Sequence, residues 1–356
     1  MHAKKHLQWL EEEGLIEFAE SNSHVFKKVL QDCLDVQKDE RILIITDKGY
    51  EGRRLAAIIS GGYYLAAREL GIDATLIRQK PKIKGDSADD NVLIALNELG
   101  NNNVVILSLS GKLGSIRTLS HSYRSYIKEN HHRFVSASNL GKLKEDDYET
   151  VLNTIDIDYK KLQETGEKLK KEIGQGNQIR ITTEAGTDVV VGLRNPAVLN
   201  TGNYKNPGTG GNIPAGEVYL APRWKWVEGK IVIDGSGAYR GGTQLIEEPI
   251  TLEIKRGEII NIDGGEEADN LRETLDWATK KARHPWGIRR IGELGIGINP
   301  NAKIIGATIV DEKVKGTAHV GIGSNYWFGG TIYAIVHLDQ VFKNPKIYID
   351  GKLLKF

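Results

Sequence analysis

The chain has 356 residues, 40% hydrophobic and 27% charged, which is the composition of a globular protein with room for two domains. Its 48 basic and 47 acidic residues leave a net charge of +1, so no overall field favours a nucleic acid or an anionic membrane. No run reaches the roughly 18 apolar residues of a membrane span. The first 20 residues contain five glutamates, which is unlike a secretory signal. The single cysteine, Cys33, excludes an internal disulfide and a Cys-rich metal site. We therefore expect a cytoplasmic protein with no nucleic-acid or membrane partner.

Strand and helix patterns alternate through the first part of the chain. Strands are predicted at 41–47, 73–79, 103–110 and 133–138, and helices at 52–70, 89–100 and 116–130. This βαβα order favours an open, mostly parallel sheet with helices on both faces. The first domain, residues 1–175, is therefore predicted to be a Rossmann-like α/β domain.

One amphipathic helix is predicted at 151–173, where apolar residues recur at helical spacing among many Lys and Glu residues. The sequence GQGN at 174–177 then breaks the helix. We place the domain boundary between residues 175 and 176.

Beyond this boundary the pattern changes to hairpins. Residues 179–193 and 250–265 each predict two strands joined by a turn, at Gly186 in the first pair and at Arg256 and Gly257 in the second. A helix is predicted at 265–283, which opens with acidic and closes with basic residues as the helix dipole prefers. The second domain, residues 176–356, is thus predicted to be a β-rich α+β domain that holds a metal.

Neither a dinucleotide-binding G-x-G-x-x-G nor a P-loop motif follows the strand at 41–47, so a nucleotide site in the first domain is not expected. In the second domain, PRWKWVEG at 222–229 combines basic and aromatic side chains. If this segment is a strand, Trp224 and Trp226 share one face. We expect them to pack between subunits in preference to binding substrate.

Four Gly-rich blocks of the second domain each contain side chains that bind metals. They are GNIPAGEVYLAP with Glu217, GELGIGINP with Glu293, DEKVKGTAHVGIGSNYW with His319 and Tyr326, and IVHLD with His337 and Asp339. Taken singly, each residue is more simply explained by packing or by a loop. Together, three carboxylates, two imidazoles and a phenol from separate segments predict a shell for two ions, and these ligands suit Zn, Co, Mn or Mg.

The spacing of His337 and Asp339 in the last block also predicts the direction of their side chains. In an extended strand over 334–341, His337 and Asp339 point to the same face, because side chains alternate. A buried imidazole and a buried carboxylate need polar partners. A metal centre is one such partner, and a hydrogen bond in the core is another.

In this order the four blocks resemble the M29 family of metallopeptidases, the aminopeptidase T type. The similar text is N-I-P-x-G-E-V-x-x-A-P, G-E-x-G-I-G-x-N-P, D-E-K-x-x-G-T-x-H with a tyrosine seven residues later, and H-x-D, and it covers most of residues 180–356. The resemblance implies two divalent ions (Zn, Co, Mn or Mg), a peptide substrate, an aminopeptidase (hydrolase) activity and a homodimer. Its implied metal ligands are Glu217, Glu293, His319, Tyr326, His337 and Asp339. Glu217, as general base, and Tyr326 are its implied catalytic residues.

Two alternatives stay open. Only ten residues separate Tyr326 from His337, a short interval for the peptidases. The family's fold also includes an iron-dependent dioxygenase that cleaves the ring of 2,5-dihydroxypyridine, in which one carboxylate, His337 and Asp339 would hold a single Fe(II). The third hypothesis is a metal-binding protein without enzymatic activity.

Overall fold

The computed structural model describes residues 2–355, which divide into two compact units. One unit contains the chain up to Tyr159 together with Gly202–Pro214, and the other contains Lys160–Thr201 and the chain from Ala215 onward. The predicted domain boundary between residues 175 and 176 stays a prediction. Among residues 2–355, no helix has both the length and the apolar character needed to cross a membrane.

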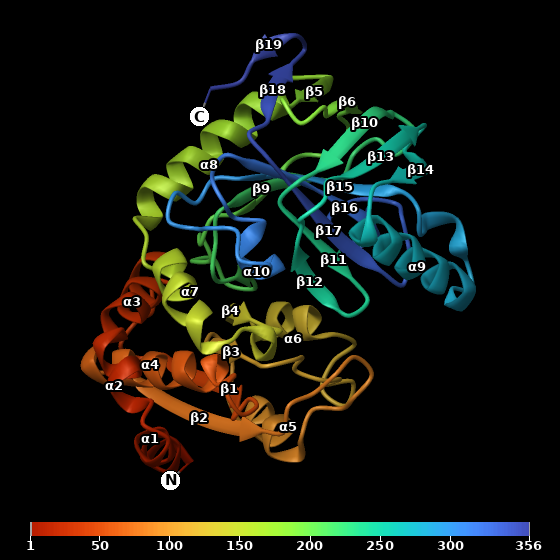
Figure 1. Cartoon of the computed structure of the whole chain (residues 1–356). Coiled ribbons are helices and arrows are strands. Elements are labelled where there is room, and N and C mark those ends of the chain that lie inside the picture. The colour runs from red at the N-terminus through yellow and green to blue at the C-terminus, as the bar shows by residue number, and fades with distance from the viewer. Residues whose placement is uncertain (1, 356) are drawn as a thin grey trace. The chain divides into compact units, whose positions relative to one another are not determined.

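The first unit is built on a five-stranded parallel sheet with the strand order β2-β1-β3-β4-β8 (Figure 1). Its strands are β1 (Arg41–Asp47), β2 (Asp73–Gln79), β3 (Val104–Ser108), β4 (Arg133–Ala137) and β8 (Gly210–Asn212). Its helices are α1 (His2–Glu12), α2 (Ile16–Ser21), α3 (Ser23–Lys28), η1 (Val29–Cys33), α4 (Leu55–Glu69), α5 (Asp90–Asn97), α6 (Tyr123–Glu129), η2 (Leu140–Lys142), η3 (Glu145–Asp147) and α7 (Tyr148–Ile155). The predicted parallel α/β architecture is confirmed.

Alternating side chains of β1 divide this core between two helical layers. Leu43 and Ile45 belong to one buried cluster with Val92 of α5 and Ile127 of α6. On the opposite face, the hydroxyl of Thr46 donates to the carbonyl of Ala56 in α4 at 3.2 Å. Every residue of β1 after Arg41 is buried, so the strand has no solvent-exposed face, as expected for a central parallel strand.

Two predicted helices differ from the structure. Only residues 123–129 of the predicted helix at 116–130 are helical. The single helix predicted at 151–173 is instead α7 and α8 (Tyr159–Gly174), since the chain leaves the helical conformation at Asp156, with φ −78° and ψ 80°. The carboxylate of Asp156 pairs with Lys28, a contact between residues far apart in sequence that no periodicity signals.

Two buried histidines make the stability of the first unit depend on pH. His132 accepts a hydrogen bond from the backbone N–H of Asn103 at its Nδ1, 3.1 Å away, while burial lowers its pKa from 6.5 to about 4. His6 is buried with Nε2 3.0 Å from the carbonyl of Ala57, and burial likewise lowers its pKa to about 4. Each folded pKa lies below the unfolded value, so protons bind preferentially to the unfolded chain below pH 6.5.

We predict that the free energy of unfolding falls as pH drops from 6.5 to about 4, by roughly 2–3 kcal/mol for each histidine. His132→Asn keeps an acceptor for Asn103 but does not titrate, so denaturation curves of this variant should show a shallower pH dependence. The exposed His121→Asn is the matched control. An identical pH slope in wild type and His132→Asn would contradict the prediction.

The second unit contains two seven-stranded antiparallel sheets. One has the order β14-β13-β10-β6-β5-β18-β19 and is formed by β5 (Gln178–Thr182), β6 (Asp188–Gly192), β10 (Val227–Ile233), β13 (Ile250–Lys255), β14 (Glu258–Asp263), β18 (Lys346–Ile349) and β19 (Lys352–Leu353). The other has the order β12-β11-β17-β16-β15-β9-β7 and is formed by β7 (Val198–Asn200), β9 (Glu217–Leu220), β11 (Ser236–Tyr239), β12 (Gly242–Leu245), β15 (Ile291–Gly297), β16 (Thr317–Gly323) and β17 (His337–Lys343). The predicted β-rich character is confirmed.

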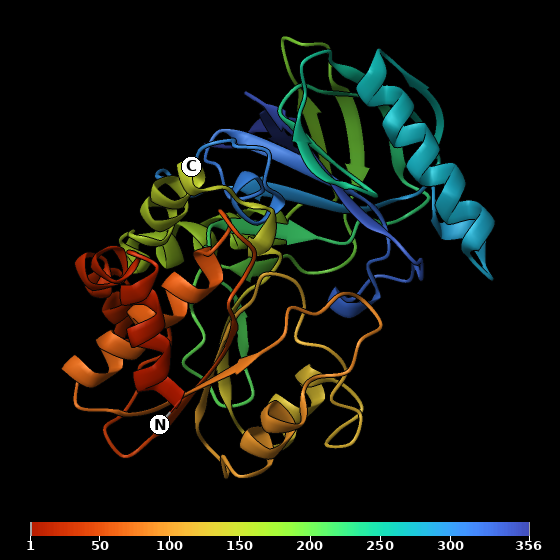
Figure 2. The same ribbon diagram turned by 60° about the horizontal axis from the view of Figure 1, so that its bottom comes forward.

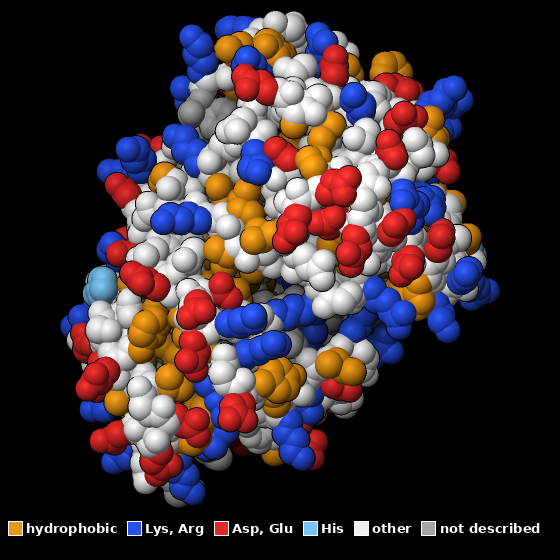
Figure 3. All heavy atoms as spheres, viewed as in Figure 1, with side chains coloured by type: hydrophobic (Ala, Val, Ile, Leu, Met, Phe, Trp, Pro, Cys, Tyr) orange, Lys and Arg blue, Asp and Glu red, His pale blue; other side chains and the backbone are white. Residues whose placement is uncertain are grey.

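The helices of this unit are α8, α9 (Glu266–Lys281), η4 (Pro285–Gly287), α10 (Thr308–Asp311) and η5 (Tyr326–Phe328). Figure 2 shows α9 in cyan along the outer side of this unit. Both predicted hairpins form, and Gly186, Arg256 and Gly257 have positive φ at their turns. Figure 3 shows both basic and acidic side chains on this face of the molecule.

Candidate metal centre

Four neighbouring strands of the second sheet carry five of the six predicted ligands. Glu217 opens β9, Glu293 lies in β15, His319 lies in β16, and His337 and Asp339 lie in β17. Because β9, β15, β16 and β17 are consecutive in the sheet, residues up to 122 positions apart in the sequence become neighbours. The alternation predicted for His337 and Asp339 places both on the side that faces Glu293.

Glycines opposite these residues explain why the ligand blocks are Gly-rich. In the strand register, His319 pairs with Gly295, Asp339 and Glu293 each pair with Gly321, and His337 pairs with Gly323. A Cβ on Gly295 would lie 2.1 Å from Nε2 of His319. A Cβ on Gly321 would lie 2.7 Å from Cε1 of His337. The space for the ligand side chains therefore depends on the absence of side chains across the ladder.

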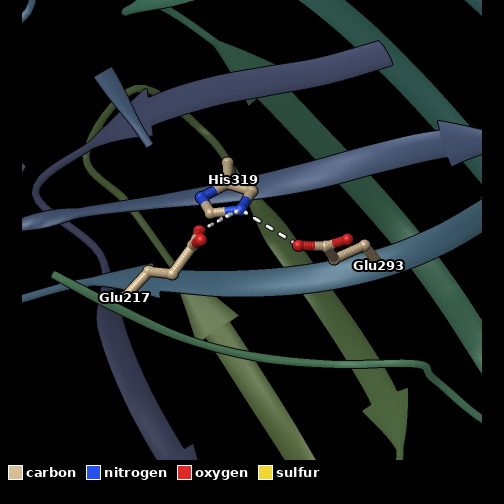
Figure 4. A group of neighbouring side chains, drawn as sticks. All are labelled: Glu217, Glu293 and His319. Atoms are coloured by element: carbon tan, nitrogen blue, oxygen red, sulfur yellow. Dashed lines mark hydrogen bonds and ion pairs between the residues drawn. The ribbon is translucent and has the colours of Figure 1, made fainter. Parts of the chain in front are cut away.

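The ligand atoms converge on one another. Nε2 of His319 lies 3.5 Å from Oε2 of Glu217 and 3.4 Å from Oε1 of Glu293 (Figure 4). Nε2 of His337 lies 3.3 Å from the other oxygen of Glu293 and 3.0 Å from Oδ1 of Asp339. Glu293 thus belongs to two overlapping donor sets.

These donor sets fit a divalent ion. Within each of the sets Glu217–Glu293–His319 and Glu293–His337–Asp339, one ligand atom per residue lies within 4.8 Å of the others. Ligand atoms bound to one ion at about 2.1 Å are roughly 3.0–3.4 Å apart for octahedral or tetrahedral angles, close to the distances above. The buried oxygen Oε2 of Glu217 also has no hydrogen-bond partner among the described residues. The cluster has the donor atoms and spacing of a metal site.

The cluster favours positive charge within it. Burial opposes charging of His319, but Glu293, Glu217 and Asp339 outweigh it and raise the pKa of His319 to about 9. In the same way, Asp339 and Glu293 overcome burial and raise the pKa of His337 to about 10. Both shifts express a local excess of carboxylate that a bound cation would neutralise.

Hydrogen bonds outside the cluster hold two ligands in position. Nδ1 of His337 lies 2.8 Å from the carbonyl of Ser324, so this nitrogen carries the proton and Nε2 is left to face the cluster. Glu217 accepts a hydrogen bond at Oε1 from the side chain of Asn200, at 3.1 Å. The ligand orientations are therefore set before any ion binds.

Sequence reasoning missed two charged residues beside the cluster. Lys313 is fully buried and its ammonium pairs with Glu217 and with Glu312. Glu312 also forms a third donor set with His319 and Asp339. Both residues stand in the DEK text of the third block, but only the fold shows that the lysine is inside the protein.

Tyr326 makes different contacts from the other predicted ligands. Its ring is 50% exposed and stacks on Tyr333 with ring centroids 4.2 Å apart. Of the other predicted ligands, Glu217, Glu293, His319 and Asp339 are buried. Trp327, its neighbour in η5, packs edge-on against the ring of His337 at 5.0 Å. The predicted roles of Tyr326 as a ligand and a catalytic group stay predictions.

Comparison with known families tests the resemblance to the peptidases. The model of the NicX family, 2,5-dihydroxypyridine 5,6-dioxygenase, matches residues 21–354. The chain belongs to the NicX family.

Two similar proteins bear the same description. A 2,5-dihydroxypyridine 5,6-dioxygenase of Pseudomonas putida KT2440 is 28% identical over 188 residues, which are 50% of this chain and 52% of that protein, so the match spans about half the length of this relative. The solved structure of 2,5-dihydroxypyridine dioxygenase from the same organism superposes with a TM-score of 0.72 at 19% identity, covering 94% of this chain and 95% of that one. At this identity the structural match shows that the two chains share a fold, and it carries no information about the reaction.

The predicted resemblance to aminopeptidase T holds at the level of the fold. AmpT from Thermus thermophilus superposes with a TM-score of 0.61 at 16% identity, covering 95% of this chain and all of that one. The predicted aminopeptidase activity, with its hydrolase and protease classes, is wrong, because the NicX family model covers nearly the whole chain. The quoted blocks specify a fold and a set of carboxylate and imidazole side chains, which do not determine the reaction.

Proposed function

We propose that this protein is an Fe(II)-dependent dioxygenase that opens the ring of a hydroxylated pyridine. The observation that carries the proposal is the NicX family match over residues 21–354. The buried cluster of carboxylates and imidazoles supports it, because these ligands suit non-haem iron. The six-residue ligand set, the homodimer and the cytoplasmic location remain predictions beside it.

Glu293, His337 and Asp339 are the residues we assign to hold the iron. Their ligand atoms form one compact donor set, and His337 is 22% exposed while the other two are nearly buried. The ring of His337 therefore marks the side of the cluster that a small molecule can approach. When bound, Fe(II) supplies the one-electron chemistry that lets dioxygen react with a closed-shell ring.

The protein side chains would orient the ring and accept its proton. Trp327, 46% exposed and packed against His337, offers an apolar surface beside the open side of the cluster for a planar ring. Oε2 of Glu217 has no hydrogen bond, whereas Oε1 is held by Asn200 and Lys313. We assign this oxygen, which faces Nε2 of His319 at 3.5 Å, as the acceptor for a hydroxyl proton of the substrate.

The proposal is tested by oxygen uptake with 2,5-dihydroxypyridine. We expect chelated protein to regain dioxygen consumption, coupled to loss of the ring absorbance, when Fe(II) is added, and not when Zn(II) is added, since zinc has no accessible redox chemistry. Both oxygen atoms of isotopically labelled dioxygen should enter the ring-opened product. Retention of iron without oxygen uptake would instead favour the metal-binding protein without enzymatic activity.

A further inference from the structure

A basic and aromatic cavity lies in the second unit within the segment that the sequence singled out as PRWKWVEG. Its volume is about 320 Å³, at the lower end of the range for small-molecule sites. Its walls come from the turn Arg223–Trp226, from Arg194 and Asn195 after β6, and from Gly329 and Thr331 after η5. None of these residues is among the ligands of the metal centre.

The main wall of this cavity is an ordered turn. The backbone N–H of Trp226 donates to the carbonyl of Arg223 at 2.7 Å, and the N–H of Arg223 donates to the carbonyl of Gly192 at 2.9 Å. The side chain of Asn195 donates to the carbonyl of Ala221 at 3.1 Å. The sequence-based expectation that Trp224 and Trp226 share a strand face is therefore wrong, because β10 begins only at Val227.

Three cations line this cavity and no acidic residue does. Within residues 2–355, Arg194, Arg223 and Lys225 each lack a carboxylate within the 4.0 Å of an ion pair. Nearby Arg290 differs, since it lies over Trp224 but pairs with Glu258 at 2.9 Å. The charges of the three cavity cations are thus uncompensated by protein side chains.

Two of these cations make cation–π contacts with aromatic rings. The guanidinium of Arg223 lies 4.3 Å from the ring centroid of Trp226, and the ammonium of Lys225 lies 4.6 Å from that of Trp224. A guanidinium held over a ring by cation–π attraction keeps N–H groups that can donate to a carboxylate. The exposed indole of Trp226, 56% accessible, offers a surface for a planar ring.

We propose that this cavity binds a small aromatic carboxylate, with the carboxylate on Arg223 and its neighbouring cations and the ring against the indole surfaces. No lining residue of the cavity belongs to the donor sets of the metal centre, and the proposal does not rest on the proposed dioxygenase activity. It assigns PRWKWVEG a ligand-binding role in place of the subunit packing that the sequence favoured.

The test measures binding of four probes to the full-length, metal-loaded protein by tryptophan fluorescence and calorimetry. Benzoate carries both recognition features, benzamide and cyclohexanecarboxylate each lack one, and inorganic phosphate is an anion without a ring. We expect benzoate to bind at least about 10-fold more tightly than each of the other three, since each lacks one of the two recognition features and a 10-fold loss corresponds to about 1.4 kcal/mol.

Variants locate the site. Arg223→Ala should weaken benzoate binding by about 10-fold or more, while Arg180→Ala, an exposed arginine in the same unit that pairs with Asp188, should leave it unchanged. Trp226→Phe keeps an aromatic surface and should retain binding with a smaller fluorescence change. Far-ultraviolet circular dichroism and the melting temperature check that each variant is folded.

Four results would overturn the proposal. Equal affinity for benzoate and phosphate would show a general anion patch, and equal affinity for benzoate and benzamide would show that charge is not recognised. If benzoate binding survives Arg223→Ala, benzoate binds at another site, such as the metal centre, and not in this cavity. Absence of benzoate binding together with loss of a dimer in Trp226→Ala, measured by sedimentation, would identify the turn as a subunit interface.

Discussion

Glu293→Gln is expected to abolish both metal retention and turnover. Glu293 places one oxygen 3.4 Å from His319 and the other 3.3 Å from His337, so it is common to the two overlapping donor sets. The substitution keeps the shape of the side chain but removes its charge and one of its two acceptor oxygens. Because loss even of a residue that merely supports a ligand lowers metal affinity about 10–100-fold, we expect a loss beyond about 100-fold here.

Two further variants show which donor set holds the iron. His337→Ala removes an imidazole from the set that we assign to the ion, and His319→Ala removes one from the other set. We expect His337→Ala to lose iron on dialysis and His319→Ala to keep a larger share of it. The reverse order would move the ion to the Glu217–Glu293–His319 set.

Metal content after dialysis, measured by mass spectrometry, is the readout for these variants, and oxygen uptake is the second. Glu253→Gln is the control, because Glu253 is an exposed glutamate on β13 of the same unit. This variant should keep wild-type iron and activity. Full iron content in Glu293→Gln would contradict the assignment of the cluster as the metal centre.

The strands and their alternation were predictable from the sequence, because they follow from local patterns. The β-branched run at 41–47 and the turns at Gly186 and Gly257 each contain their own structural signal. The period of two placed His337 and Asp339 on one face without any knowledge of the sheet. The convergence of Glu217, Glu293 and His319 depends on the order of the strands, which local pattern does not give, and the resemblance supplied only the list of implied ligands.

What the sequence did not predict depends on contacts between distant segments. Lys313 looks like a solvated lysine, yet it is buried because Glu217, 96 residues earlier, accepts from it. The break between α7 and α8 at Asp156 has no periodic signal in the sequence, and the same residue pairs with the distant Lys28. The reaction itself was predicted wrongly because the same carboxylate and imidazole ligands serve hydrolysis with one metal and oxygen chemistry with another.

Lys313→Met is expected to cause the largest loss of stability among single substitutions near the metal centre. The ammonium of Lys313 is fully buried between Glu217 and Glu312, whose side chains are only 7% and 12% exposed. Although burial lowers the pKa of Lys313, the two carboxylates outweigh it and raise the value, so the lysine stays charged. Removing one partner of a buried ion pair leaves an uncompensated charge and costs about 3–5 kcal/mol.

The loss should depend on the metal. In chelated protein, Lys313→Met removes the ammonium that lies between Glu217 and Glu312, whereas a bound divalent ion neutralises part of the carboxylate charge. We therefore expect denaturant unfolding to show a larger destabilisation of the chelated variant than of the metal-loaded one. The exposed Lys315→Met, two residues away, should change stability by no more than about 0.5 kcal/mol in either state. If Lys313→Met behaved like Lys315→Met, the buried ammonium would have no role in holding the carboxylates of the cluster, and their orientation would have to come from Asn200 and the strand ladder alone.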